Sequence, residues 1–168
     1  MPREIYHPLL QRLLTDLEGA QTRCHGPRLF LTGAVLDEPR LLDLIQELGA
    51  QVVGDDLCSG SRHFQGQVEV QEDPIAALAD YFLQRTPCPA KFHPTHSPGD
   101  GVLEQVRRSQ AQGVVFILEK FCESHAFDYA LARTALDRAG VPHLFLEMEQ
   151  TPSLEAVRTR LQAFLEML

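Results

Sequence analysis

Basic residues are scarce in this sequence relative to acidic ones. Its 168 residues include 15 Lys and Arg against 23 Asp and Glu, which gives a net charge of −8. Nucleic acids and anionic membrane surfaces bind clustered Lys and Arg, so we expect neither as a main partner. No apolar run approaches the roughly 18 residues that cross a bilayer, and the N-terminus lacks the layout of a signal peptide. The sequence therefore predicts a cytoplasmic protein.

Paired cysteines and nucleotide-binding loops are also missing. The four cysteines, Cys24, Cys58, Cys88 and Cys122, stand far apart and form no C-x-x-C pair. In a cytosolic chain such cysteines are more often free thiols or metal ligands than disulfides. The sequence contains no G-x-G-x-x-G or Walker-type loop, so neither motif supports a nucleotide site.

A zinc site receives little support. Cys88, His93 and His96 lie close together in the sequence, but their spacing matches no strong zinc pattern. The prolines between them favour an extended loop. For Cys24 and Cys88 we favour the ordinary role of a small buried apolar side chain.

Short apolar runs alternate with amphipathic segments along the chain. Strands are expected at residues 28–35, 51–55, 113–118 and 141–147, and helices at 3–21, 37–48, 74–84, 99–112, 127–139 and 153–168. This alternation predicts a parallel sheet with right-handed crossovers and helices on both faces. We predict one three-layer, flavodoxin- or Rossmann-like α/β domain over residues 1–168. Its four-stranded, mostly parallel sheet is expected to have the strand order 2-1-3-4.

Several helix starts have recognisable capping residues. Asp37 is expected to cap the second helix, with Pro39 in its first turn. Asp73 and the following proline are expected to open the third. Ser153 is expected to cap the last helix, with Glu155 in its first turn.

Ligands of open α/β sheets bind beyond the carboxyl ends of the strands. The residues at or just beyond the ends of the four expected strands are Thr32, Gly33 and Ala34; Asp55, Asp56, Cys58, Ser59 and Arg62; Lys120, Cys122, Glu123 and His125; and Glu147, Glu149 and Gln150. In the expected strand order, Cys58 and Cys122 would lie about 10 Å apart, or two strand spacings. Both could instead be inert thiols, and Asp55 and Asp56 could simply cap a loop.

Three stretches resemble a known family. They are GDDLCSGSRHF at 54–64, EKFCESHAFDY at 119–129, and LFLEMEQ at 144–150 followed by RTRLQAFLE at 158–166. Together they resemble the C-terminal half of the 2-hydroxyacyl-CoA dehydratase and benzoyl-CoA reductase subunits. The resemblance covers nearly the whole chain, in order and with natural spacing.

The resemblance implies a specific chemistry. In that family, two similar α/β domains hold a [4Fe-4S] cluster between them, mainly through three cysteines. An ATP-driven activator protein gives the cluster one electron, which passes to an acyl-CoA thioester. Dehydratases then expel a hydroxyl group through a ketyl radical, and reductases reduce an aromatic ring. These enzymes are anaerobic and cytoplasmic.

The resemblance also suggests site residues. Cys122, in Lys-Phe-Cys, resembles the cluster ligand that the C-terminal domain supplies, and Cys58 occupies a second position that could be a ligand. Lys120, Asp56 and Glu147 are the other candidates for cofactor binding. No residue is assigned to catalysis.

The family's N-terminal domain has no counterpart in this sequence. One domain with one or two ligands cannot complete a four-iron cluster, which normally needs about four thiolates or three and an external ligand. We therefore expect an incomplete cluster site, or none, in this chain alone. A homodimer sharing Cys58 and Cys122 would supply four thiolates and overturn this expectation.

Two hypotheses follow. The first is a cluster-domain fragment or short subunit of an anaerobic dehydratase or reductase. Its partners would be an N-terminal domain or companion subunit, the activator and an acyl-CoA. The alternative is a non-catalytic α/β binding or assembly module that retains the fold without a cluster.

The missing domain has further expected consequences. An uncovered interface should leave an exposed apolar surface near the first helix or the strand ends, and this surface should cause self-association. Cys122 precedes an expected helix, whose N-terminus favours negative charge. We therefore expect Cys122 to be the most thiolate-like cysteine, followed by Cys58, with Cys24 and Cys88 no faster than a free thiol.

Overall fold

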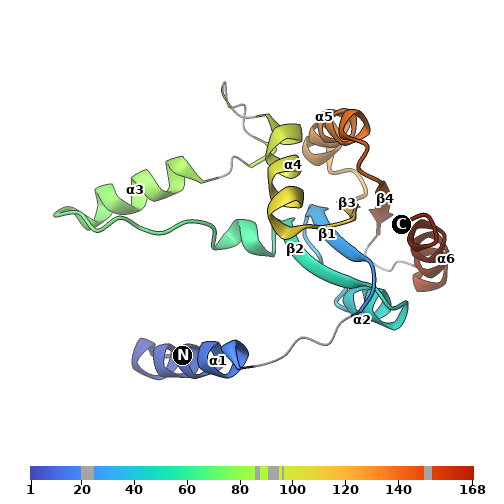
Figure 1. Cartoon of the computed structure of the whole chain (residues 1–168). Helices are drawn as coiled ribbons and strands as arrows, with labels where there is room; N and C mark the ends of the chain where they lie inside the picture. Colours follow the sequence, from blue (N-terminus) through green and yellow to red (C-terminus); the bar gives the residue numbers. More distant parts are fainter. Residues whose placement is uncertain (20–24, 86–87, 91–94, 96, 150–152) are drawn as a thin grey trace.

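Four parallel strands form the centre of the fold (Figure 1). The computed structural model describes residues 1–19, 25–85, 88–90, 95, 97–149 and 153–168. The strands are β1 (Arg28–Gly33), β2 (Gln51–Leu57), β3 (Gly113–Glu119) and β4 (His143–Met148). Their order is β2-β1-β3-β4, and every neighbouring pair is parallel. The predicted fold class and strand order are thus confirmed, and the sheet is parallel throughout.

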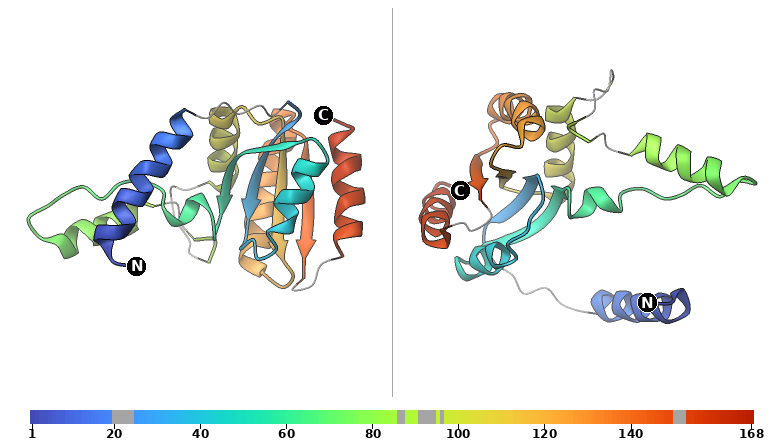
Figure 2. Two further views of the ribbon diagram at one scale, coloured as in Figure 1. Left: turned by 90° about the horizontal axis from the view of Figure 1, so that it is seen from below. Right: turned by 180° about the vertical axis from the view of Figure 1, so that it is seen from behind.

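Helices cover both faces of this sheet (Figure 2). Helices α2 (Arg40–Glu47) and α6 (Leu154–Leu165) pack against one face, and α4 (Pro98–Ser109) and α5 (Glu123–Ala139) against the other. Each face has its own apolar cluster. The result is the three-layer arrangement expected from the sequence.

Burial on both faces explains why the strands are apolar at nearly every position. In β1, Leu29 and Leu31 belong to the cluster beneath α2 and α6, whereas Phe30 belongs to the cluster beneath α4 and α5. All three are at most 2% exposed. Successive strand residues point to opposite faces, so a strand covered on both sides loses the usual alternation of apolar and polar residues.

Two helices extend away from the sheet: α1 (Arg3–Glu18) and α3 (Pro74–Gln84) (Figures 1 and 2). No residue of α1 is buried in the part of the chain that the structure describes, and in α3 the buried residue is Ala77. The exposed apolar side chains of α1 are Ile5, Tyr6, Leu9, Leu10, Leu13, Leu14 and Leu17. The apolar surface expected near the first helix is therefore present.

The cap expected for α2 was wrong. Its N-cap is Pro39, without a side-chain cap bond among the described residues. Glu38 serves instead, because its carboxylate accepts a hydrogen bond from the backbone N–H of Arg40 at 3.1 Å. At α3 the expected cap is confirmed: Asp73 accepts from the N–H of Ile75 at 2.8 Å.

Other boundaries differ by a few residues from the expected ones. Helix α1 ends at Glu18 rather than near 21, and α4 ends at Ser109 because Gln110 adopts the left-handed conformation. Helix α5 begins at Glu123, one turn earlier than expected. Ser153 stands at the N-cap of α6, but no side-chain cap bond is found there among the described residues.

Candidate functional site at the strand ends

A glycine allows the β1 and β3 ends to meet closely. Gly33 has φ +128°, and a Cβ atom there would lie 2.1 Å from the carbonyl oxygen of Ile117. The same oxygen accepts a hydrogen bond from the N–H of Ala34 at 2.8 Å. A side chain at position 33 would therefore push apart the two central strands at the edge where ligands bind in such sheets.

Asp55 shapes the loop that carries Cys58. Its Oδ1 accepts hydrogen bonds from the N–H groups of Leu57, at 3.1 Å, and Ser61, at 2.7 Å. A Cβ atom on Gly60 would lie 2.0 Å from this same oxygen, so the loop needs glycine there. The loop-capping role considered for Asp55 is thus the one observed, although Asp55 itself lies within β2 rather than after it.

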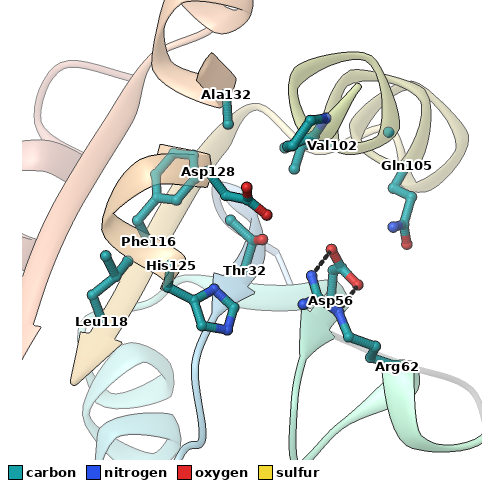
Figure 3. A pocket seen from close by; sticks show the side chains of 12 residues that line it. Thr32, Asp56, Arg62, Val102, Gln105, Phe116, Leu118, His125, Asp128 and Ala132 are labelled. Atoms are coloured by element: carbon teal, nitrogen blue, oxygen red, sulfur yellow. Dashed lines mark hydrogen bonds and ion pairs between the residues drawn. The ribbon is translucent and has the colours of Figure 1, made fainter. Parts of the chain in front are cut away.

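Asp56 and Arg62 form a buried ion pair. Arg62 donates from Nε to Oδ1 of Asp56 at 3.0 Å and from Nη2 to Oδ2 at 2.6 Å (Figure 3). Their side chains are 5% and 14% exposed. Burial alone would lower the pKa of Arg62, but the hydrogen bonds and charge of Asp56 outweigh it and raise that pKa. Asp56 also lies inside β2, which ends at Leu57, so the expected strand end at Asp55 was two residues too early.

A cavity of about 60 Å³ lies beside this ion pair, between the sheet and helices α4 and α5. Polar side chains from four elements line it: Thr32 from β1, Asp56 from β2, Gln105 from α4, and Asp128 from α5 (Figure 3). Arg62 also lines it, and its Nη1 is buried with no hydrogen-bond partner among the described residues. The cavity is large enough for water and polar enough to hold it.

Cys58 contacts a buried histidine. Its Sγ lies 3.2 Å from Nε2 of His125, in the first turn of α5. Burial and, to a smaller extent, the charge of Arg62 lower the pKa of His125 to about 4, and the charge of Asp56 opposes this shift. Burial also raises the pKa of the Cys58 thiol, against the opposing effect of Arg62. Both groups are therefore held in their neutral forms at neutral pH.

Cys122 is the N-cap residue of α5, directly after the end of β3. Its backbone N–H donates to the carbonyl of Glu119 at 3.0 Å, and its side chain makes no cap hydrogen bond within the described residues. The preceding Phe121 has φ +70° and is 88% exposed. The structure thus places this half-buried thiol at the N-terminus of α5.

Lys120 and Glu147 do not join this site. Lys120 Nζ binds Glu149 Oε1 at 2.8 Å, and that hydrogen bond and charge raise the pKa of Lys120. Glu147 lies in β4, the strand at the sheet edge, and is exposed. The structure therefore brings together Asp56, Cys58 and the Cys122 helix turn, and leaves the other two candidates outside this group.

The thiols fit an iron–sulfur cluster in chemistry but not in number. Cys58, Cys88 and Cys122 are free, and charge on Cys88 or Cys122 would raise the pKa of Cys58. Within the described ranges, however, no three Cys, His, Asp or Glu side chains are placed to hold one metal ion. Residues 24, 93 and 96, which include two members of the possible zinc set, lie outside those ranges. The described residues thus supply at most part of a ligand set.

His125 follows the third expected strand but is not among the predicted site residues, and its contact with Cys58 was missed. The reason is the expected helix start at residue 127, which left His125 in a loop. With α5 beginning at Glu123, His125 is one turn from Cys122 and faces the β2 loop. The apolar periodicity of α5 marks its buried middle better than its polar first turn.

The fold and site together define a class: a doubly wound α/β domain with two cysteine-bearing loops at the strand ends. The family of the 2-hydroxyglutaryl-CoA dehydratase D-component matches residues 1–168, and the chain belongs to this family. It is 28% identical to the (R)-phenyllactyl-CoA dehydratase beta subunit of Clostridium sporogenes over all of its own length. It is 25% identical to a benzoyl-CoA reductase subunit of Thauera aromatica over 82% of its length. The family predicted from the sequence motifs is therefore confirmed.

The chain spans less than half the length of these relatives. It covers 45% of the phenyllactyl-CoA dehydratase subunit, 46% of lactoyl-CoA dehydratase subunit beta of Anaerotignum propionicum, and 37% of the benzoyl-CoA reductase subunit. Among the helices of the described ranges, none has the length and apolar character required to cross a membrane.

Proposed function

We propose that this chain is the C-terminal cluster domain, or a short subunit, of an acyl-CoA dehydratase or reductase. In this proposal Cys122 is its ligand to a [4Fe-4S] cluster that is completed by thiolates from another domain or a companion subunit. The observation that carries the proposal is the place of Cys122: at a helix N-terminus, beyond the end of a central strand, with no side-chain cap bond to any residue that the structure describes. The relatives' description as subunits supports a companion.

The chemistry of the [4Fe-4S] cluster and the roles of this chain's residues are separate parts of the proposal. A bound cluster would supply one-electron reduction of an acyl-CoA thioester, after an ATP-dependent activator has reduced it. Of this chain's own residues, Cys122 would bind the cluster. Cys58 is the second sulfur at this edge, but its contact with His125 already occupies it.

The test is iron and acid-labile sulfide analysis of the full chain, affinity-purified anaerobically from its own host so that any companion is retained. We expect iron and sulfide in the wild-type complex, and loss of at least half of both in Cys122→Ser. Cys88→Ser is the matched control, because Cys88 is exposed, and it should keep the wild-type content. A Cys122→Ser complex that retains all its iron would refute the ligand assignment.

The same experiment separates the alternative function. A chain that purifies with a companion but without iron or sulfide, under conditions that preserve other clusters in the host, would favour a non-catalytic binding or assembly module. Gene context adds a second criterion, because a neighbouring gene for the missing half or for an activator ATPase favours the enzyme.

A further inference from the structure

The contact between Cys58 and His125 connects two loops that follow different strands. Cys58 comes directly after β2, and His125 lies in the first turn of α5, after β3. In the sheet these strands are separated by β1, so the contact crosses above the end of the central strand. It joins the first family-like stretch, at Cys58, to the second, at His125.

The β2 side of the contact is firmly held. The N–H of Cys58 donates to the carbonyl of Ala34 at 3.2 Å, and Ser59 Oγ accepts from the N–H of Leu36 at 3.0 Å. The Asp56–Arg62 ion pair fixes the residues on either side of this loop. Cys58 therefore offers a well-positioned anchor.

The α5 side has less support of its own. Phe121 has a left-handed backbone with φ +70°, which is unfavourable for a residue other than glycine. Cys122 provides no side-chain cap within the described residues, so one or more N–H groups of the first turn lack that partner. The first turn depends on backbone bonds such as Ala126 N–H to Cys122 O, at 3.1 Å. His125, at 7% exposure, is the side chain through which this turn reaches the anchor.

We propose that Cys58 and His125 form a thiol–imidazole latch that positions the first turn of α5, and with it Cys122. In this proposal Cys58 is a positioning residue and not a cluster ligand. The identity of the group that Cys122 binds rests on the proposed function. The latch between Cys58 and His125 does not.

The chemistry of both partners agrees with this role. Burial favours the protonated thiol of Cys58 and the unprotonated ring of His125, and a neutral pair can share a hydrogen bond between sulfur and Nε2. Metal ligation and nucleophilic attack both need the thiolate instead. Cys122 stands at the N-cap of α5, outside this contact, so the two sulfurs lie in different environments.

The first test is amide hydrogen exchange of the full chain, read at Ala126. Cys58→Ala removes the latch, and we expect exchange at Ala126 to accelerate about five- to tenfold, as for loss of one hydrogen bond. Cys58→Ser keeps a donor and acceptor at the same place and should restore most of the protection. Cys88→Ser is the control and should have no effect. Unchanged exchange in Cys58→Ala, or equal acceleration in the serine and alanine variants, would overturn the latch.

The second test compares the two thiols directly. Iodoacetamide labelling of the folded chain at pH 7, read by peptide mass spectrometry, should modify Cys122 faster than Cys58. In the same experiment, His125→Ala should raise the labelling rate of Cys58 by a larger factor than the labelling rate of Cys88. Faster labelling of Cys58 than of Cys122 in the wild-type chain would contradict the proposal.

Iron analysis separates failure of the latch from failure of the proposed function. In the anaerobically purified complex, Cys58→Ser should retain most of its iron while Cys122→Ser loses it. Equal loss in both variants would make Cys58 a ligand and refute the latch. If neither variant loses iron, the proposed function fails, and the exchange result at Ala126 still decides the latch.

Discussion

Arg62 binds both carboxylate oxygens of Asp56, and the two side chains are only 14% and 5% exposed. Removing one partner of a buried pair leaves an uncompensated charge. We therefore expect Asp56→Ala to lower the free energy of unfolding by about 3–5 kcal/mol, measured by urea denaturation.

The exposed pair between Arg158 and Glu47 is the matched control. Its N–O distance is also 2.6 Å, but its side chains are 39% and 60% exposed. Arg158→Ala should cost less than about 1 kcal/mol. Similar losses in both variants would mean that burial of the Asp56–Arg62 pair does not determine its importance.

His125 should make the stability of the chain dependent on pH. Its pKa is about 4 in the folded chain, against 6.5 for an unburied histidine. Between these values the unfolded chain binds the additional proton, so the free energy of unfolding should fall as the pH drops from 6.5 to 4. The expected loss is about 2–3 kcal/mol, and no further loss from this group should occur below pH 4.

His125→Gln is the control for this pH effect, since glutamine keeps hydrogen-bonding atoms but does not titrate. The charged groups that act on His125 are Arg62 and Asp56, and both are still present in the variant. The difference between the wild-type and variant unfolding curves should therefore be confined to the same pH window. Parallel curves would show that His125 does not titrate differently in the folded state.

Gly33→Ala should be much more damaging than Gly49→Ala. Both glycines have positive φ, +128° and +81°, but the added methyl would meet the Ile117 oxygen at 2.1 Å in the first case and no atom within 4 Å in the second. We expect a loss of about 3 kcal/mol or more at Gly33 and about 1–2 kcal/mol at Gly49. Thermal unfolding of the two variants measures the difference, and equal losses would exclude a close strand approach at Gly33.

The exposed face of α1 should cause self-association of the purified chain. Leu10, Leu13 and Leu17 are 36%, 52% and 57% exposed and lie on neighbouring turns. Replacing all three by serine should reduce association in sedimentation velocity experiments at high concentration. Serine at Gln11 and Thr15 of the same helix is the control and should leave association unchanged. A wild-type chain that sediments strictly as a monomer would contradict this expectation.

The strands and their order were predictable because burial on both faces leaves a strong sequence signal. Apolar runs such as Gly113–Glu119 are too short for membrane helices and are separated by amphipathic segments, which favours parallel strands with helical crossovers. Helix ends were less predictable. Asp37 has the chemistry of a cap, but the neighbouring Glu38 takes that role through a contact that depends on the local backbone.

The site was predictable only in part, because some of its contacts also depend on the local course of the backbone. The position of Cys122 after a central strand follows from topology, and the motifs marked both cysteine loops. The pairing of Cys58 with His125 depends on where α5 begins and on the course of the loop through Gly60. Lys120, predicted as a cofactor-binding residue, pairs with Glu149 through a side-chain contact that the sequence did not predict.

The strand order also has a consequence for biosynthesis. Strand β1 is the first strand to be synthesised, but its neighbour β3 follows only after α4. The backbone pairing of Leu29 with Gly113 therefore forms late in synthesis. Until then, a nascent chain contains β1 and β2 with an unpaired apolar edge, which is prone to pair with other chains. The pairing of β1 with β3 therefore cannot form before β3 has been synthesised, and we expect ribosome-bound chains ending before residue 113 to be recognised by chaperones or to form aggregates.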